Sequence, residues 1–438
     1  MIVDVFILNY NGAHFLSRCL ESVLASRTDG ISLSVVVADN GSTDNSADVV
    51  RQYPDAQWLP LGGNLGYVRG NNEAVRLRLA ARAAQNLPQP NVLIFLNNDV
   101  EVAKDWLVSL LSPIAHDDIG IVGAKSLFLD PFVPLRVDSE TVTNQKEQAL
   151  LKTSLSVEGG SHPSLSYPGR IKPLGPTLSS DGISWTIGDK VTFLIPAHVD
   201  IPTAIHLRLA CAPGASPCRL SFSVDGHALG EQTLLASQTT EISLEIPPGY
   251  ARRFIQNAGT FIERKFVVGD RGFLQEDKGQ FASQENISAV CGVSLAIRCS
   301  LFKKLGGFSE DFVSYYEDVD LSLRARLLGF RCVYNPRAVI NHVHAGSGIE
   351  GSEYFTRTVA ESRTMFLSKY SGPIQFWGRV GKEMAIACRE ISLPPNNARP
   401  HTQALFACAA KARAIVRNRL LYWAKGYFWR IPKLIGRV

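Results

Sequence analysis

The chain has 438 residues, of which 45% are hydrophobic and 19% are charged, and its formal net charge at pH 7 is +5. This length is too great for one ordinary core, so two or three structural units are expected. The composition excludes wholesale disorder, and the small net charge gives no reason to expect a nucleic-acid partner. No apolar run reaches the roughly 18–20 residues of a membrane-spanning helix, and the segment MIVDVFILNYNG is interpreted as a strand rather than a signal peptide. The cytoplasm is the expected location.

Residues 1–133 alternate apolar runs with segments of helix length. VDVFILNY, LSVVVAD, NVLIFLNNDV and IGIVGAK are expected strands, and the Asn, Gly, Ser and Asp residues after them are typical of turns and helix starts. Strands that alternate with helices predict an α/β unit whose parallel sheet has helices on both faces. Such sheets bind ligands beyond the carboxyl ends of their strands, where this sequence has Asn9, Asn11, Asp39, Asn97, Asn98 and Asp99.

Residues 134–251 have a different pattern. Short alternating segments such as KVTFLIP, IHLRLAC, CRLSFSVDG and TTEISLEIP are separated by clusters of Pro, Gly and Ser, and SFSV–DGHALGEQTLL predicts a hairpin. Several short strands without helices predict an all-β sandwich. Because the mixed pattern returns at residue 252, the sandwich is expected to be inserted within the α/β unit, in a loop that tolerates it.

Residues 252–348 are expected to complete the α/β unit. CGVSLAIR and FRCVYN are expected strands, and AVINHVHAGSG closes this part of the chain. SLFKKLGGF predicts a helix that ends at Gly306 and Gly307, and SYYEDVDLSLRARLLGF predicts a second helix opened by acidic residues. Residues 349–438 are expected to form a helical, increasingly basic C-terminal region.

The tail from residue 411 has basic side chains interleaved with aliphatic and aromatic ones and no acidic residue. Its basic residues are Lys411, Arg413, Arg417, Arg419, Lys425, Arg430, Lys433 and Arg437. One interpretation is a surface helix that brings residues 411–438 to an anionic membrane, here the inner face of the cytoplasmic membrane. The alternative is an ordinary amphipathic helix docked on the α/β unit, with its charges in solvent.

Several blocks of this sequence, in order, resemble family 2 glycosyltransferases of the subgroup that includes bacterial rhamnosyltransferases. The blocks are FILNYNG (6–12), VVVADNGSTDNS (35–46), GGNLGYVRGNN (62–72), IFLNNDVEV (94–102) and CGVSLAIR…LGGFSEDFVSYYEDVDLSLR…HVHAGSG (291–348). The resemblance implies a GT-A fold and an inverting mechanism. It also implies a nucleotide-diphospho-sugar donor, dTDP-rhamnose or else a UDP-sugar, and a glycan or lipid-linked saccharide acceptor in bacterial surface polysaccharide synthesis. It does not cover the inserted sandwich.

The resemblance also implies a set of donor-binding residues, which are Asn9, Asn11, Asp39, Asn64, Gly66, Arg69, Asn71 and Asn98. In it, Asp39 accepts a hydrogen bond from a pyrimidine ring. Arg69 replaces the usual small residue, so it would either contact phosphate or face solvent. From the residues alone, a glycine-rich loop before a helix suits an anion, whereas the residues after Asp39 are equally typical of a turn and a helix cap.

Asn97-Asn98-Asp99 follows the apolar strand VLIFL and stands at the place of the family's Asp-x-Asp metal motif. Mg²⁺ or Mn²⁺ takes oxygen ligands from one or two carboxylates and from phosphates. Since Asn97 replaces the first carboxylate, Asp99 is the expected ligand and the affinity for metal is expected to be modest. His342 matches a family histidine that completes the metal shell or contacts the diphosphate, and His344 is the second candidate. A strand-end turn and a structural histidine are the alternatives.

Tyr315-Tyr316-Glu317-Asp318 precedes the second predicted helix. An inverting transfer needs a general base that takes the proton of the acceptor hydroxyl. The resemblance places this base at Asp318, with Glu317 contacting the acceptor or supporting the loop. The alternative is that both carboxylates only cap the helix, and Asp320 with Arg324 is expected to form a helix-surface pair. A rival function is a catalytically weak or inactive carbohydrate-binding protein that acts through the sandwich.

Overall fold

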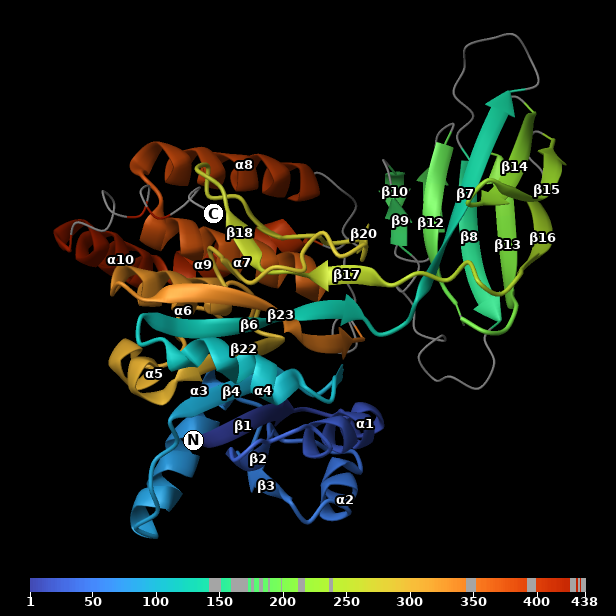
Figure 1. The fold of residues 1–438 in the computed structure, drawn as a ribbon. Coiled ribbons are helices and arrows are strands. Elements are labelled where there is room, and N and C mark those ends of the chain that lie inside the picture. The colour runs from blue at the N-terminus through green and yellow to red at the C-terminus, as the bar shows by residue number, and fades with distance from the viewer. Residues whose placement is uncertain are drawn as a thin grey trace.

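The structure is a computed structural model that describes residues 1–141, 151–158, 172–174, 177–180, 184–187, 190–197, 199–211, 217–235, 239–343, 352–391, 399–425, 431 and 434. His344 and the tail residues Arg430, Lys433 and Arg437 lie outside this part of the chain. Figure 1 shows an α/β body that contains both the first strands and the C-terminal helices, and beside it a smaller body made of strands.

The α/β body is built on an 11-stranded sheet, along which β20, β17, β6, β22, β4, β1, β2 and β3 follow one another. β1 (Ile2–Asn9), β2 (Ser32–Asp39), β3 (Ala56–Pro60) and β4 (Val92–Asn97) are parallel. These strands of residues 1–133 are parallel, as predicted, and the sheet becomes mixed where strands of residues 252–348 join it. β22 (Ser294–Arg298) lies between β4 and β6 (Ile119–Phe128) and is antiparallel to both, because the chain enters it from the opposite edge of the sheet.

Helices cover both faces of this sheet, as the sequence predicts. Successive residues of a strand point to opposite faces. Val3, Val5 and Ile7 of β1 pack with α1 (Ala13–Leu24), α2 (Ser46–Arg51) and α4 (Trp106–Leu111). Phe6 lies on the other face in a core with α3 (Gly66–Ala84), α5 (Cys299–Leu305) and α6 (Glu317–Leu327). α5 ends at Gly306, whose φ is 73°, as predicted.

The two segments expected before and after residue 336 form one strand, β23 (Arg331–His342). It runs parallel to β6 and antiparallel to the short β5 (Val100–Val102). Its register with β6 shifts between Asn335 and Val339, and this irregularity accommodates Pro336, which has no N–H to donate. The pairing places His342 opposite Val100 and so beside the end of β4.

The smaller body contains two five-stranded sheets formed by residues between β6 and β17. One has the order β15 (His227–Leu234), β14 (Cys218–Val224), β7 (Phe132–Thr141), β12 (Lys190–Pro196), β9 (Lys172–Leu174). The other has β10 (Thr177–Ser180), β11 (Ser184–Ile187), β8 (Leu151–Glu158), β13 (Thr203–Cys211), β16 (Thr239–Ile246). Apolar side chains of both sheets share one core. The β14–β15 hairpin turns at Asp225 and Gly226, whose φ values of 48° and 81° are those a two-residue hairpin requires.

The chain leaves and re-enters the large sheet at one place. β7 follows β6 after a short link, and β17 (Phe254–Asn257) returns to pair with β6. At the junction, the backbone N–H groups of Phe132 and Arg252 each donate to the other's carbonyl oxygen at 2.8 Å. The short strands β18 (Thr260–Ile262), β19 (Val268–Asp270), β20 (Gln275–Glu276) and β21 (Glu285–Asn286) follow. The domain boundaries after residues 133, 251 and 348 stay predictions.

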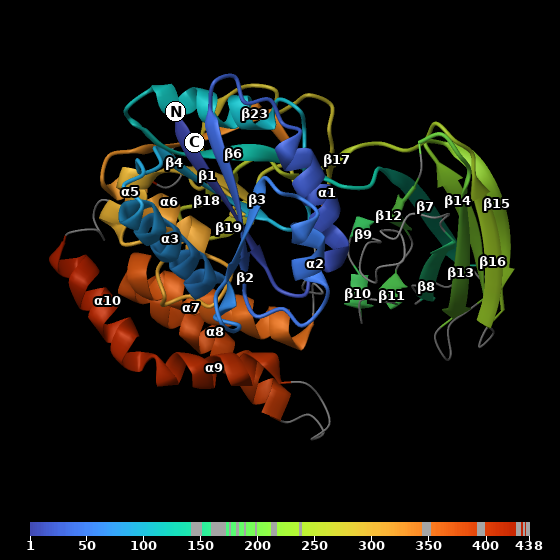
Figure 2. The same cartoon turned by 90° about the horizontal axis from the view of Figure 1, so that it is seen from below.

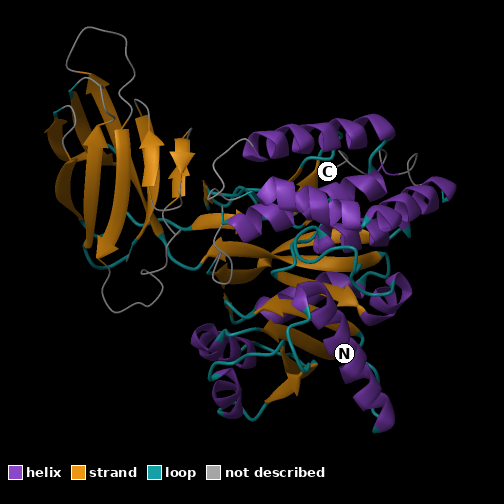
Figure 3. Cartoon of the chain, turned by 180° about the vertical axis from the view of Figure 1, so that it is seen from behind, coloured by secondary structure: helices purple, strands orange, loops and turns teal. Residues whose placement is uncertain are grey.

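Four helices end the described chain: α7 (Glu353–Tyr370), α8 (Pro373–Ile391), α9 (Pro400–Ala410) and α10 (Ala412–Ala424). Figures 2 and 3 show them gathered along one side of the α/β body, and Figure 1 shows that this side is opposite β1–β3. Lys411 pairs with Glu361, and Arg417 pairs with Asp311 at 3.1 Å, so two basic residues of the tail contact carboxylates of the α/β body. Among the described helices, none combines the length and apolar character needed to cross a membrane.

Candidate functional site

The carboxyl ends of β1, β2 and β4 meet at one edge of the large sheet, because Asn9 is paired in register with Asp39 and Leu8 with Asn97. The polar side chains there are linked to one another. Asn98 Nδ2 donates to Asn9 Oδ1 at 2.8 Å, and Asn9 Nδ2 donates to Ser42 Oγ at 3.0 Å. The expected polar edge is therefore one connected network.

The loop after β2 extends this network. The N–H of Ser42 donates to the Asp39 carboxylate at 3.2 Å, and the N–H of Thr43 donates to Asn11 Oδ1 at 2.7 Å. This network requires a glycine at residue 12, because a Cβ there would lie 2.1 Å from Asn98 Nδ2. Any side chain at residue 12 would displace the amide that joins β4 to β1.

The glycine-rich loop before α3 lies against the same edge. Asn40 Nδ2 donates to Asn64 Oδ1 at 3.1 Å, and Asn64 Oδ1 also accepts from the N–H of Gly66 at 2.9 Å. Asn71 is buried, and its Nδ2 donates to the Tyr67 carbonyl at 3.0 Å. Arg69 is 66% exposed and pairs with Glu310 at 3.1 Å. Arg69 therefore lies at the surface, and its contact with a donor phosphate stays a prediction.

A cavity of about 380 Å³ lies beside this edge, next to the end of β4, since Asn97 and Asp99 line it. It brings together the residues predicted from distant parts of the chain, namely Asp99, His342, Glu317 and Asp318. The other predicted side chains do not line it. Asn9, Asn11, Asp39, Asn64, Gly66, Arg69, Asn71 and Asn98 belong to the polar edge and the loop next to it. The predicted residues thus form two adjoining groups.

Asp99 and His342 form the first pair in the cavity. His342 Nε2 lies 3.1 Å from Asp99 Oδ1, and both side chains are nearly buried. On the other side of the ring, Nδ1 lies 2.7 Å from Gln256 Oε1, which also accepts from the Ser126 hydroxyl at 2.6 Å. Because Gln256 Oε1 is an acceptor, Nδ1 is the donor, and Nε2 then faces a carboxylate oxygen. His342 Nε2 and Asp99 Oδ1 would then point lone pairs at each other. A cation between them, either a proton or a metal ion, makes this contact favourable.

The pair fits a small divalent cation that takes its remaining ligands from a substrate. Carboxylate oxygen and imidazole nitrogen are both suitable ligands for Mn²⁺, and Mg²⁺ commonly uses one or two carboxylates together with substrate phosphates. In the part of the chain that the structure describes, no group of three or more His, Cys, Asp or Glu side chains could hold a metal by itself. A metal at Asp99 and His342 would need further ligands, and the oxygens of a substrate diphosphate are suitable ones.

Glu317 and Asp318 form the second pair, at the start of α6. The N–H of Gly292 donates to Asp318 Oδ2 and the N–H of Val319 to Asp318 Oδ1, both at 2.7 Å, so the carboxylate is fixed in the cavity wall. Burial raises the pKa of Asp318 to about 6, although these two N–H groups act in the opposite direction. Burial and the neighbouring Asp318 charge raise the pKa of Glu317 well above its usual range. Within the described chain, the buried Glu317 Oε2 has no hydrogen-bond partner.

The backbone before this pair is strained. Tyr315 and Tyr316 have φ values of 64° and 67°, in the left-handed region that bulky residues rarely adopt. Strain of this kind costs about 1–3 kcal/mol per residue and is retained where the surroundings enforce it, often at functional sites. Here α7 enforces it, since the ring of Tyr315 packs on Phe355 and that of Tyr316 on Phe366.

The expectation that Asp320 and Arg324 form a helix-surface pair is wrong. Asp320 is fully buried and contacts Arg324 at 2.7 Å, Lys369 Nζ at 3.1 Å and the Tyr370 hydroxyl at 2.7 Å. Although burial acts to raise it, Lys369 and Arg324 hold the pKa of Asp320 below its usual range. Spacing of four residues showed that the pair could form, but not that α7 covers this face of α6. Asp320 thus fixes the helix that carries Asp318.

Sequence reasoning missed several residues of the cavity wall. Asp270, on β19, is oriented by Asn257 Nδ2 at 2.6 Å and by the Thr260 hydroxyl at 3.2 Å, and Phe355 of α7 also lines the cavity. These residues come from short strands and a C-terminal helix without a recognisable motif. The only signal was the polar run Gln256-Asn257 directly after an apolar pair, followed by Gly259, whose φ is 100°.

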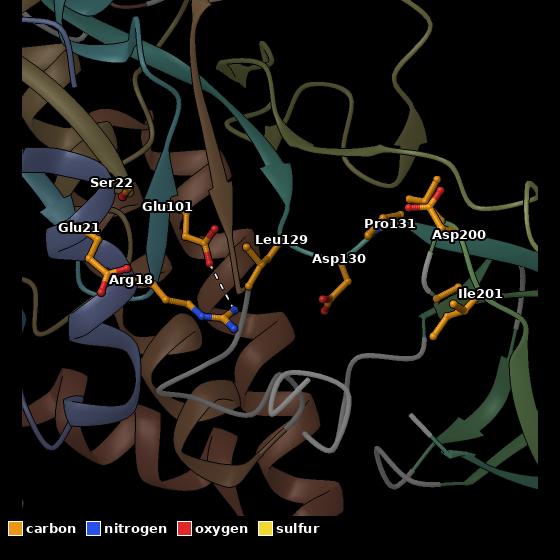
Figure 4. Close-up of a pocket in the computed structure, with 11 residues that line it drawn as sticks. Arg18, Glu21, Ser22, Glu101, Leu129, Asp130, Pro131, Asp200 and Ile201 are labelled. Atoms are coloured by element: carbon orange, nitrogen blue, oxygen red, sulfur yellow. Dashed lines mark hydrogen bonds and ion pairs between the residues drawn. The ribbon is translucent and has the colours of Figure 1, made fainter. Parts of the chain in front are cut away.

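A second hollow of about 900 Å³ lies between the α/β body and the smaller body. Figure 4 shows Arg18 of α1 reaching Glu101 of β5 on one side, with Asp130 beyond them and Asp200 and Ile201 on the other side. None of the predicted site residues lines this hollow. The cavity at Asp99 and Asp318 is therefore the candidate site.

Comparisons with known proteins agree with the motifs. Residues 4–160 match the model of the family described as "Glycosyl transferase family 2". A segment of 152 residues is 27% identical to the glycosyltransferase AglE of Haloferax volcanii, covering 33% of this chain and 47% of that protein. A segment of 75 residues is 35% identical to the N-acetylglucosaminyl-diphospho-decaprenol L-rhamnosyltransferase of Mycobacterium tuberculosis, covering 17% and 24%.

These matches span less than half the length of the curated relatives. Among solved structures, a mannosyltransferase from Pyrobaculum calidifontis in complex with GDP-Man and Mn²⁺ is similar over 99% of this chain and 84% of that one, at 13% identity. Its TM-score of 0.40 is too low for that likeness to carry an argument. Residues 4–160 therefore match a glycosyl transferase family 2 domain, and the mixed sheet with its covering helices and C-terminal helices agrees with the predicted GT-A fold.

Proposed function

We propose that this chain is an inverting, metal-dependent glycosyltransferase that moves a sugar from a nucleotide-diphospho-sugar to a carbohydrate acceptor. The observation that carries the proposal is the cavity that holds Asp99 and His342 together with Glu317 and Asp318. Asp99 and His342 are suited to hold a cation, and the pair Glu317 and Asp318 can supply a general base. An inverting, metal-dependent transfer needs both. The rival function, carbohydrate binding through the β sheets, is supported by no comparable cluster in the described residues of those sheets.

The charge of the cavity supports a requirement for metal. Asp99, Asp270, Glu317 and Asp318 line it, and among its described lining residues there is no Lys or Arg. A diphosphate would add further negative charge to this space. When bound, a divalent cation would neutralise the diphosphate and polarise it as a leaving group. Asp99 and His342 are the residues that would hold it.

Asp318 is the proposed base. Its carboxylate is held by two backbone N–H groups, so it would meet the acceptor hydroxyl in a fixed orientation. In the ionised form it would take the hydroxyl proton as the oxygen attacks the anomeric carbon. Glu317 keeps its proton to a higher pH than an ordinary glutamate, so it can donate a hydrogen bond to an acceptor oxygen.

The pKa of Asp318 predicts a pH dependence. Only the ionised carboxylate is a base, and its pKa in the folded protein is about 6. As the pH falls through this value the base becomes protonated, so kcat/KM should fall about tenfold per pH unit below it and level off above it. A pH series of initial rates at low acceptor concentration measures this. The residual activity of an Asp318→Asn variant should lack this acidic limb, and a wild-type profile that stays flat to pH 5 would contradict the assignment.

For the donor we propose dTDP-rhamnose, or else a UDP-sugar. The order of the sequence blocks and the local similarity to a mycobacterial L-rhamnosyltransferase support this choice. For the acceptor we propose a surface glycan or a lipid-linked saccharide, made on the cytoplasmic side, with residues 411–438 in contact with anionic lipid. The test is to incubate the full chain with a panel of nucleotide-sugars and Mn²⁺ and to measure release of the nucleoside diphosphate. Release from none of them, with or without added acceptor saccharides, would refute the proposed function.

The two five-stranded sheets are proposed to position an acceptor or partner and to take no part in bond making. Because Phe132 and Arg252 are hydrogen-bonded neighbours, a short linker can replace residues 136–250 without stretching the large sheet. The shortened protein is expected to fold and to hydrolyse donor at a rate within about threefold of wild type, because none of the described residues that line the cavity at Asp99 and Asp318 lies between 136 and 250. Circular dichroism checks folding and nucleotide release checks hydrolysis. Loss of hydrolysis in a folded protein would show that the sheets take part in the reaction.

A further inference from the structure

α8 has an apolar face that no other described element covers. Its exposed apolar side chains are Ile374, Trp377, Met384 and Ile391, whose exposed fractions are 87%, 65%, 54% and 56%. At 3.6 residues per turn these positions lie within an arc of roughly 100° on one side of the helix. Gly381 and the exposed Cys388 fall in the same arc. Figures 1 and 3 show α8 along the outer edge of the α/β body.

The charges of α8 are divided between its two faces. Both glutamates point inward and are nearly buried. Glu383 contacts Arg379, Arg363 and His401, and Glu390 accepts from the backbone N–H groups of His401 and Thr402. The charged residues of α8 that are exposed are Lys382 and Arg389, at one border of the apolar arc. No acidic residue follows Glu390 in the sequence.

This combination fits a lipid surface with anionic head groups. A helix that lies in a membrane interface buries an apolar face with an aromatic residue at head-group depth, and its flanking lysines and arginines reach the lipid phosphates. A second copy of the chain fits less well, because two such faces would bring Lys382 and Arg389 near their counterparts with no exposed carboxylate of α8 to neutralise them.

We propose that α8 is a membrane-docking helix that inserts its apolar arc into the interface of an anionic bilayer. The docking surface is defined by Ile374, Trp377, Met384 and Ile391, with Lys382 and Arg389 at its border. This extends the membrane contact proposed for residues 411–438, because it assigns apolar insertion to a different helix. It does not depend on the donor or on the reaction.

The test is co-sedimentation of the full chain with phosphatidylcholine vesicles, with and without phosphatidylglycerol. Wild type is expected to bind the anionic vesicles. The triple variant Ile374→Ser/Trp377→Ser/Met384→Ser is expected to bind them at least about tenfold more weakly, because it loses most of the inserted apolar area. Lys382→Glu/Arg389→Glu should also weaken binding, and its effect should shrink at high salt.

A matched control removes the same number of exposed apolar side chains elsewhere. Val199→Ser/Ile201→Ser/Leu235→Ser changes side chains that are each 50% exposed in the smaller body, and it should bind vesicles like wild type. All variants should keep the melting temperature and the solution-phase donor hydrolysis of wild type, which separates this proposal from the proposed function. Equal binding by the α8 triple variant and wild type would overturn the proposal that α8 docks on a membrane. Failure of wild type to bind either kind of vesicle would also overturn it. So would sedimentation velocity showing a wild-type dimer that this variant dissociates.

Discussion

Asp318→Asn is expected to lower turnover by about a hundredfold to ten-thousandfold, which is the usual contribution of a general base. The amide has the shape of the carboxylate, but it has only one oxygen, so it keeps at most one of the two hydrogen bonds from the N–H groups of Gly292 and Val319, and it cannot take a proton. Donor binding should survive, because Asp99 and the polar edge are untouched. Single-turnover rates and donor titrations measure the two effects separately.

The same variant makes a prediction about stability that separates a chemical defect from a folding defect. The pKa of Asp318 in the folded protein is raised from 3.8 to about 6, so the ionised carboxylate is held less favourably than in the unfolded chain. Above pH 6 this ionised group lowers the stability of the folded protein, and the penalty disappears as the pH falls through the two values. Asp318→Asn lacks this penalty but loses a hydrogen bond at every pH, so the amount by which it melts below wild type should be smaller at pH 7.5 than at pH 5.

A surface carboxylate is the matched control for Asp318→Asn. Asp118→Asn removes a carboxylate that pairs with Arg331 far from the cavity and should leave turnover unchanged. Asp320→Asn is unsuitable as a control, because breaking a buried ion-pair network costs about 3–5 kcal/mol of stability. If Asp318→Asn had near-normal turnover and Glu317→Gln were inactive, the base would be Glu317 and not Asp318. If neither change mattered, the two carboxylates would only cap α6.

The polar residues that follow β1, β2 and β4 could be placed from the sequence, because the periodicity of the apolar runs alone shows where these strands end. Apolar runs that end in Asn9, Asp39 and Asn97 must meet at one edge once their strands are parallel and in register. The motif order then linked Asp318 and His342 to that edge. For His342, the decisive fact is the pairing of β23 with β5, which a continuous strand and a shifted register produce.

The rest of the site could not be predicted because it depends on which faces pack together. Asp270 reaches the cavity only through the β18–β19 hairpin, and Phe355 reaches it only because α7 crosses the start of α6. The basic tail illustrates the same limit. Lys411 and Arg417 pair with carboxylates of the α/β body, whereas Ile374 and Trp377 are 87% and 65% exposed on α8, a helix in which the sequence showed nothing unusual.

Asp99→Asn is expected to lower metal-dependent turnover by about a hundredfold or more, because stabilising the charge of a leaving diphosphate is worth several kcal/mol. The variant keeps the side-chain volume but removes the negative charge that faces His342 Nε2 at 3.1 Å. Weaker binding of the cation should appear without any reaction. Mn²⁺ titrated into the protein together with a nucleoside diphosphate, and followed by the electron paramagnetic resonance of free Mn²⁺, should bind the variant at least about tenfold more weakly.

The matched control is Glu101→Gln, which removes a carboxylate two residues away that pairs with Arg18 and lines the second hollow instead of the cavity. It should alter neither Mn²⁺ binding nor turnover. Wild type treated with a chelator should lose activity and regain it with Mn²⁺ or Mg²⁺. Full activity after chelation, with no gain from either ion, would contradict the proposed metal site. The contact between Asp99 and His342 would then be structural, and groups other than a metal would have to neutralise the diphosphate.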